Sequence, residues 1–132
     1  MLSKNLEPII PQLEELTRSL FPEILKIYRN PRSSAQAKKD GSPVTAADVY
    51  AHKVIVKFLK KHFPDIPVVS EESFKQKNYK PAKEFWIIDP IDGTKEFVNK
   101  SDEFTTNIAL IQNGKPVLGV VGAPAFYQVW SA

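Results

Sequence analysis

Hydrophobic residues recur along this 132-residue chain first with helical spacing and later with the shorter spacing of strands. Apolar side chains every three or four positions predict an amphipathic helix over residues 5–30, which Pro22 kinks or divides. A second helix is predicted from Thr45, which can cap it, to about His62. Between the two helices, residues 30–43 are polar and contain proline and glycine, which predicts a loop or a loose hairpin.

The second half of the chain has the apolar runs of short strands. They are predicted at residues 66–70, 85–88, 105–112, 116–121 and 126–130. Asn113 and Gly114 form a strong hairpin signal between the third and fourth of these strands. The pattern predicts an α+β fold, with a mostly antiparallel sheet packed against two long helices. The chain stops inside the last apolar strand, so we expect a fragment or a truncated product.

Composition indicates one small globular domain. The chain is 42% hydrophobic and 25% charged, and no apolar run reaches the length of a membrane span or of a signal-peptide core. The absence of cysteine excludes disulfides and thiolate metal sites and fits a reducing compartment. A net charge of +3, spread over scattered basic residues, favours a small anionic ligand over a nucleic acid polymer.

The most informative segment is residues 89–94, Asp-Pro-Ile-Asp-Gly-Thr, directly after the apolar run at residues 85–88. Two carboxylates at the end of a buried strand favour Mg²⁺, which is commonly held by carboxylates and phosphate oxygens. Gly93 permits a close approach of the backbone, and a short helix from Thr94 would direct its first N–H groups at an anion. The alternative is an ordinary turn, because Asp-Pro commonly initiates one.

Further acidic residues occur at the ends of predicted elements. Asp48 lies in a first helical turn, and Glu71 and Glu72 follow a strand, as Asp89 and Asp92 do. Acids at strand ends converge when the strands are neighbours, and such a cluster can hold two or more metal ions for phosphoryl displacement. Taken singly, each has an ordinary alternative as a helix cap, a solvated side chain or a turn residue.

A family resemblance emerges from these segments. Residues 86–94 resemble the signature of the inositol monophosphatase superfamily, which contains Mg²⁺-dependent, Li⁺-sensitive phosphatases. Residues 42–48 and 69–73 look like the two upstream motifs of that family, in the same order. The continuation is similar to 3'(2'),5'-bisphosphate nucleotidases of the CysQ type in residues 95–97, 103–105, 107–111 and 114–121.

The resemblance implies a magnesium site with two or three ions. The side chains of Glu71, Asp89 and Asp92 would be ligands, together with the backbone carbonyl of Ile91. Family members have a second half, which completes the metal site and the pocket and which this sequence lacks. The resemblance therefore implies the N-terminal half of a layered αβαβα sugar-phosphatase fold, as one metal-binding domain over residues 1–132.

The resemblance also implies residues for catalysis and substrate binding. Asp48, Glu71 and Thr94 would be catalytic, because they would orient the attacking water. Gly93 and Thr94 would bind the phosphate through backbone N–H groups, and Lys38 and Glu71 would complete the substrate-binding set.

The implied activity is hydrolysis of adenosine 3',5'-bisphosphate to AMP and phosphate by a metal-activated water, weak or absent in this chain alone. Two alternatives stay open, an inositol-phosphate phosphatase and a non-catalytic metal-binding fragment. The expected location is cytoplasmic, with peripheral association with a bacterial inner membrane left open. A homodimer, in which the sheet edge after residue 130 pairs with a second chain, stays open as well.

Several conspicuous residues have simpler interpretations. Trp86 and Trp130 are predicted to be core aromatics. Lys95 and Lys100 are predicted to be solvated, although either could meet an anionic substrate. Asn107, inside an apolar strand, is interpreted as structural.

Overall fold

The structure, a computed structural model, describes residues 6–30, 36–37, 43–44, 46–70 and 82–132. Its helices are α1 (Ile9–Ser19), α2 (Phe21–Arg29), α3 (Ala46–His62) and α5 (Thr94–Val98), with a 3₁₀ turn at Pro124–Phe126. Its strands are β1 (Gln36–Ala37), β2 (Pro43–Val44), β3 (Val68–Ser70), β4 (Glu84–Asp92), β5 (Thr105–Gln112), β6 (Lys115–Ala123) and β7 (Gln128–Ser131).

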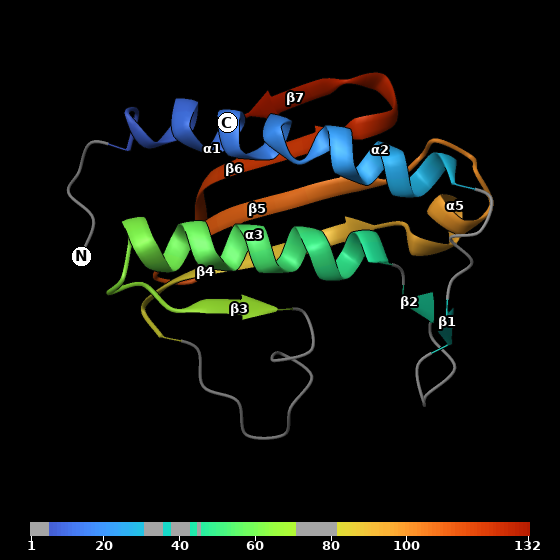
Figure 1. Ribbon diagram of the computed structural model, residues 1–132. Coiled ribbons are helices and arrows are strands. Elements are labelled where there is room, and N and C mark those ends of the chain that lie inside the picture. The colour runs from blue at the N-terminus through green and yellow to red at the C-terminus, as the bar shows by residue number, and fades with distance from the viewer. Residues whose placement is uncertain (1–5, 31–35, 38–42, 45, 71–81) are drawn as a thin grey trace.

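The main sheet has five strands in the order β3-β4-β5-β6-β7 (Figure 1). Only β3 and β4 are parallel, so the prediction of a mostly antiparallel sheet is confirmed. The predicted hairpin between β5 and β6 is confirmed too, because Asn113 and Gly114 both have positive φ angles, 51° and 77°, as a type I′ turn requires. β1 and β2 form a small antiparallel hairpin within the segment predicted as a loop or loose hairpin.

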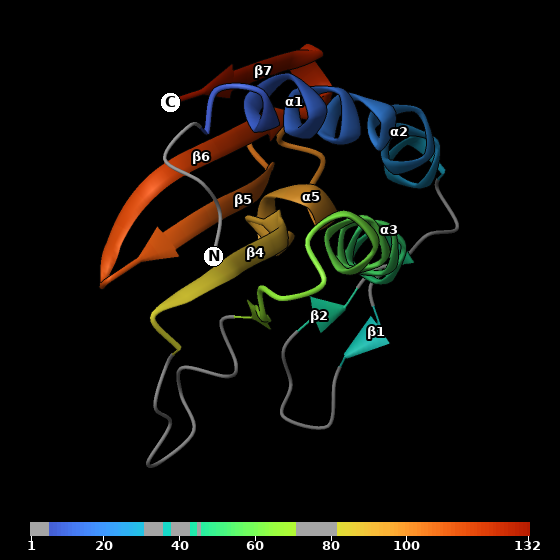
Figure 2. The same ribbon diagram turned by 90° about the vertical axis from the view of Figure 1, so that its left-hand side faces the viewer.

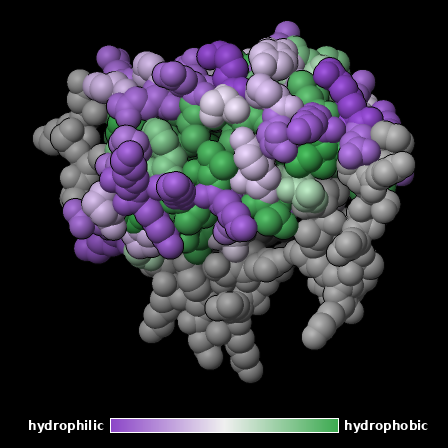
Figure 3. Space-filling model, in the orientation of Figure 1, coloured by the Kyte–Doolittle hydropathy of each residue, from purple (hydrophilic) through white to green (hydrophobic). Residues whose placement is uncertain are grey.

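Helices α1, α2 and α3 lie on one face of the five-stranded sheet (Figure 2). α1 packs over β6 and β7, and α3 packs over β3 and β4. Figure 3 shows this face, with hydrophilic residues around its rim and hydrophobic residues between them. The core lies between the two layers and includes Leu13, Leu20, Ile24, Ile55, Leu59, Trp86, Ile88, Ile108, Leu110 and Val120.

The first predicted helix is divided near Pro22, as expected. α1 ends at Ser19, and α2 begins at Phe21 with Pro22 in its first turn, where a missing N–H removes no helical hydrogen bond. α3 ends at His62, as predicted, and Asp48 lies in its first turn. The predicted cap Thr45 lies outside the described residues. None of the described helices is long and apolar enough to cross a bilayer.

Two sequence predictions need correction. The strand predicted at residues 85–88 runs to Asp92, because pairing with β5 resumes at Thr105 after the proline. Trp86 is a core residue as predicted, but the prediction for Trp130 is wrong, since 53% of this side chain is exposed. Side chains alternate along β7, and Val129 takes the position that packs against the core.

Candidate metal and phosphate site

The predicted motif lies at one end of the sheet, where β4 leads into α5. β3 ends beside it, because Ser70 pairs with Ile88 in the parallel ladder. α5 contacts β2, and the first turn of α3 lies at the same end of the molecule (Figure 1). The carboxyl ends of two neighbouring parallel strands and a helix start therefore meet around the motif.

A β-bulge interrupts β4 inside the motif. Asp89 is opposite Asn107 and Asp92 is opposite Thr105, so β4 has one more residue than β5 between these pairs. Pro90 has no N–H to donate to the ladder, which favours a bulge at this point. The Thr106 hydroxyl donates a hydrogen bond of 2.8 Å to the Pro90 carbonyl and ties the bulge to β5.

The bulge brings the two carboxylates to the same face of the sheet. In a regular strand, residues three apart point to opposite faces. Asp89 and its partner Asn107 share a face because they are directly opposite, and Asp92 hydrogen-bonds to the Asn107 side chain. Ile91 turns the other way and is 3% exposed. The two acids therefore converge on the face away from α1, α2 and α3.

The two ends of the Asn107 side-chain amide differ in their hydrogen bonding. Its Nδ2 donates to Asp92 Oδ2 at 3.2 Å, while its Oδ1 is buried and has no hydrogen-bond partner in the described part of the structure. The sequence indicated only a polar residue in an apolar strand. No local pattern identifies its contact with Asp92, which depends on the register of β4 and β5.

An open hollow of about 410 Å³ lies beside Asp89 and Asn107. Asp89 and Asn107 form its polar end, and the rest is lined by Ile87, Ile88, Ile108, Ala109, Gly119, Val120 and Val121. The hollow therefore combines a carboxylate and an amide with an apolar floor across β4, β5 and β6.

Gly93 makes the turn from β4 into α5. Its φ of 86° is in the left-handed region, and its carbonyl accepts the Phe97 N–H at 2.9 Å. A Cβ at this position would lie 3.0 Å from the Glu103 carbonyl oxygen. The Thr94 hydroxyl points back to the Ile91 carbonyl at 3.4 Å, which is long for a hydroxyl donor.

Gly93→Ala should destabilise the chain by roughly 1–3 kcal/mol from the backbone conformation, with an added cost from the contact with Glu103. Gly114→Ala is the matched control, since Gly114 has a similar φ of 77° but nothing within 4 Å of an added Cβ. Urea unfolding of both variants measures the difference. Equal destabilisation would show that the close approach at Gly93 has no energetic consequence.

An aromatic cluster packs α5 against the core. The ring centroid of Tyr28 lies 5.1 Å from that of Phe97 and 4.8 Å from that of Phe104, and the last two are 4.8 Å apart. These rings come from α2, from α5 and from the residue before β5. They fix α5 against the core, and with it the turn at Gly93.

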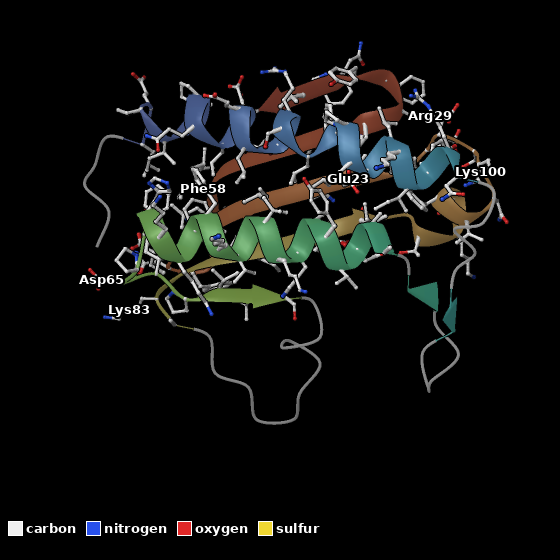
Figure 4. All side chains as sticks on the ribbon, in the orientation of Figure 1. Glu23, Arg29, Phe58, Asp65, Lys83 and Lys100 are labelled. Atoms are coloured by element: carbon white, nitrogen blue, oxygen red, sulfur yellow. The ribbon has the colours of Figure 1, made fainter. Side chains whose placement is uncertain are left out.

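The loop after α5 is bound to α2. The Tyr28 hydroxyl donates to Asp102 Oδ1 at 2.5 Å and accepts the Asp102 N–H at 2.9 Å. Lys100 is exposed, as predicted, and it also donates to the Tyr28 carbonyl and lies 4.9 Å from the centre of the Tyr28 ring, at the end of α2 (Figure 4). Lys100 and Asp102 adopt positive φ angles of 59° and 66°, which residues other than glycine rarely adopt. The contacts with Tyr28 stabilise this backbone conformation.

Burial, followed by donation to the Asp102 carboxylate, raises the pKa of Tyr28 above its ordinary value of 10.0. An unfolded tyrosine releases its proton near pH 10, whereas folded Tyr28 retains it. The stabilisation is therefore fully present below pH 10.0 and is lost as pH rises through the folded pKa. Urea unfolding between pH 8 and 11 should show a steeper loss above about pH 10 for the wild type than for Tyr28→Phe. Parallel curves would contradict this.

The family follows from comparison with known proteins. A model of the inositol monophosphatase family matches residues 5–132. The chain belongs to the inositol monophosphatase family. It is 45% identical over 132 residues to a 3'(2'),5'-bisphosphate nucleotidase CysQ from Salmonella typhimurium, with 94% of this chain and 51% of that protein covered.

Solved structures of the inositol monophosphatase family agree with the fold. CysQ from Bacteroides thetaiotaomicron is 39% identical with a TM-score of 0.68, over 89% of this chain and 42% of that one. The Thermotoga maritima IMPase is 32% identical with a TM-score of 0.79, over 95% and 48%. The predicted fold class is confirmed, and the chain spans about half the length of the relatives that it matches.

The structure describes some of the residues that this family resemblance implies. Asp89 and Asp92 lie on the same face of the sheet, and Asp48 is half-buried in the first turn of α3 at the same end of the molecule. Glu71 and Lys38 lie outside the described residues. Within the described ranges, no three acidic or histidine side chains gather as a metal-ligand group.

The described atoms fit a hard divalent cation. Two carboxylates share a face. The Ile91 carbonyl oxygen accepts the long contact from the Thr94 hydroxyl, and a carbonyl oxygen has two lone pairs, so it can also face a second partner. The buried Oδ1 of Asn107 is one more oxygen acceptor on this face, and none of the described residues donates to it. The donor set consists of oxygens, as Mg²⁺ prefers.

Proposed function

We propose that this chain forms most of the metal and phosphate site of a Mg²⁺-dependent phosphomonoesterase that hydrolyses adenosine 3',5'-bisphosphate to AMP and phosphate. The observation behind the proposal is the bulge in β4, which brings Asp89 and Asp92 to one face beside the turn at Gly93. The substrate is supported by relatives named as 3'(2'),5'-bisphosphate nucleotidases, of which the chain spans about half.

In this proposal, Asp89, Asp92 and the Ile91 carbonyl hold the metal together with Glu71. Two or three Mg²⁺ ions would make a water acidic enough to ionise near neutral pH and would neutralise charge on the leaving oxygen. The role of the described part of the chain is to keep the Asp89 and Asp92 carboxylates on one face through the bulge and the Thr106 hydrogen bond.

The phosphate would lie at the turn into α5. Gly93 has no side chain to block the backbone, and N–H groups in the first turn of a helix lack helical partners. Thr94 and Asp48 would orient the attacking water with Glu71, and Lys38 would bind the anionic substrate. The scattered positive charge of the chain is compatible with such a substrate.

The test is phosphate release from adenosine 3',5'-bisphosphate and from inositol 1-phosphate, with Mg²⁺ and with or without Li⁺. We expect release to be slow, to need Mg²⁺, to fall with Li⁺ and to be faster for the nucleotide. In parallel, calorimetry should detect Mg²⁺ binding to the chain. Absence of Mg²⁺ binding would overturn the metal site and the function with it.

The second candidate is an inositol-phosphate phosphatase. The observation in its favour is that the Thermotoga maritima IMPase has a higher TM-score, 0.79, than the Bacteroides CysQ, 0.68. Its lower sequence identity, 32% against 39%, points the other way. Faster release from inositol 1-phosphate in the same assay would establish this candidate.

A further inference from the structure

We propose that Asn107 is a positioning residue. Its side-chain NH₂ orients the Asp92 carboxylate for a divalent cation, and its buried amide oxygen faces the same site. The inference rests on the proposed function, because it needs Asp92 to be a metal ligand. It adds a residue on β5 to a motif that otherwise lies on β4 and α5.

The first support is the direction of the hydrogen bond. Asn107 Nδ2 lies 3.2 Å from Asp92 Oδ2. The opposite orientation of the amide would place an oxygen against a carboxylate oxygen, and neither can donate. The NH₂ group must therefore face Asp92. Occupation of Oδ2 leaves Oδ1 of this exposed carboxylate for a metal and restricts its rotation.

The second support is the other end of the same amide. With Nδ2 facing Asp92, Oδ1 is directed into a buried place where it has no hydrogen-bond partner among the described residues. A buried acceptor without a donor costs free energy, so it needs an explanation. Asp89 is directly opposite on β4, and both residues line the hollow. Water does not reach this oxygen in the structure, so a small rotation of the side chain toward Asp89 would let a water or a cation held there satisfy it.

A comparison within the same two strands separates this role from ordinary strand pairing. Gln112 Nε2 donates to Glu84 Oε2 at the opposite end of the β4–β5 ladder, where the two residues are directly paired. This is also an amide–carboxylate hydrogen bond between β5 and β4. It differs because the Gln112 carbonyl oxygen is not an unsatisfied buried atom in the described structure.

Asn107→Ala tests the proposal, with Gln112→Ala as the matched control and Asp92→Asn as the reference for a lost ligand. Mg²⁺ affinity is measured by calorimetry and Mn²⁺ affinity by electron paramagnetic resonance, and urea unfolding is measured with EDTA. We expect Asn107→Ala to weaken metal affinity by about 10–100-fold, as loss of a group that orients a ligand does. Gln112→Ala should bind metal as the wild type does.

A wild type that binds no Mg²⁺ would remove the proposed function and this inference together. If the wild type binds Mg²⁺, Asp92→Asn binds it weakly and Asn107→Ala binds it as tightly as the wild type, only the inference is overturned.

A second measurement does not depend on folding of the variant. The side-chain amide signals of Asn107 in the ¹⁵N spectrum of the wild type should move on addition of Mg²⁺, and unmoved signals at saturating metal would also overturn the inference.

Discussion

Asp92→Asn is expected to weaken Mg²⁺ binding by at least 100-fold, roughly 2.8 kcal/mol at about 1.4 kcal/mol per factor of ten. A carboxylate about 2.1 Å from a doubly charged ion gains roughly 4 kcal/mol even at the dielectric constant of water. The asparagine amide keeps one oxygen but has no negative charge. A water that takes the place of the carboxylate oxygen beside the ion recovers part of the lost binding free energy.

The fold should tolerate this change. Asp92 is exposed at the end of β4, and asparagine has nearly the same size. Urea unfolding without metal should therefore match the wild type within about 0.5 kcal/mol. Calorimetric titration with Mg²⁺ measures the loss of affinity. Wild-type affinity in a folded Asp92→Asn protein would contradict the assignment of Asp92 as a metal ligand.

Phe97→Ala is expected to be the most destabilising of these substitutions, by about 3–5 kcal/mol, because it removes a buried aromatic ring. Phe97 is 1% exposed and contacts both Tyr28 and Phe104. α5 has five residues, too few for a helix that is stable by itself, so its position depends on this side chain.

Loss of the Phe97 ring should also weaken the site. The Phe97 N–H is bound to the Gly93 carbonyl, so a displaced α5 changes the turn that would hold the phosphate. Val98→Ala is the control on the same helix, since Val98 is 37% exposed and should change stability far less. Urea unfolding measures both effects. Similar losses for the two variants would contradict the anchoring role of Phe97.

The candidate motif was predictable because its information is local. Residues 89–94 are consecutive, and the chemistry of two carboxylates next to Gly-Thr is readable without a fold. The apolar run before the motif and the short helix after it also depend on neighbouring residues. The metal and substrate roles of all the site residues remain predictions, and Glu71 and Lys38 also lie outside the described residues.

The sequence by itself determined the helices, the β5–β6 hairpin, the mostly antiparallel sheet and the acidic motif, because helical period, strand period and turn residues act over a few positions. Only the tertiary structure decided that a bulge places both acids on one face, that Asn107 binds Asp92 and that Tyr28 binds Asp102. These contacts join residues 15 and 74 positions apart. They depend on strand register and on the packing of α2 beside α5, which no local pattern encodes.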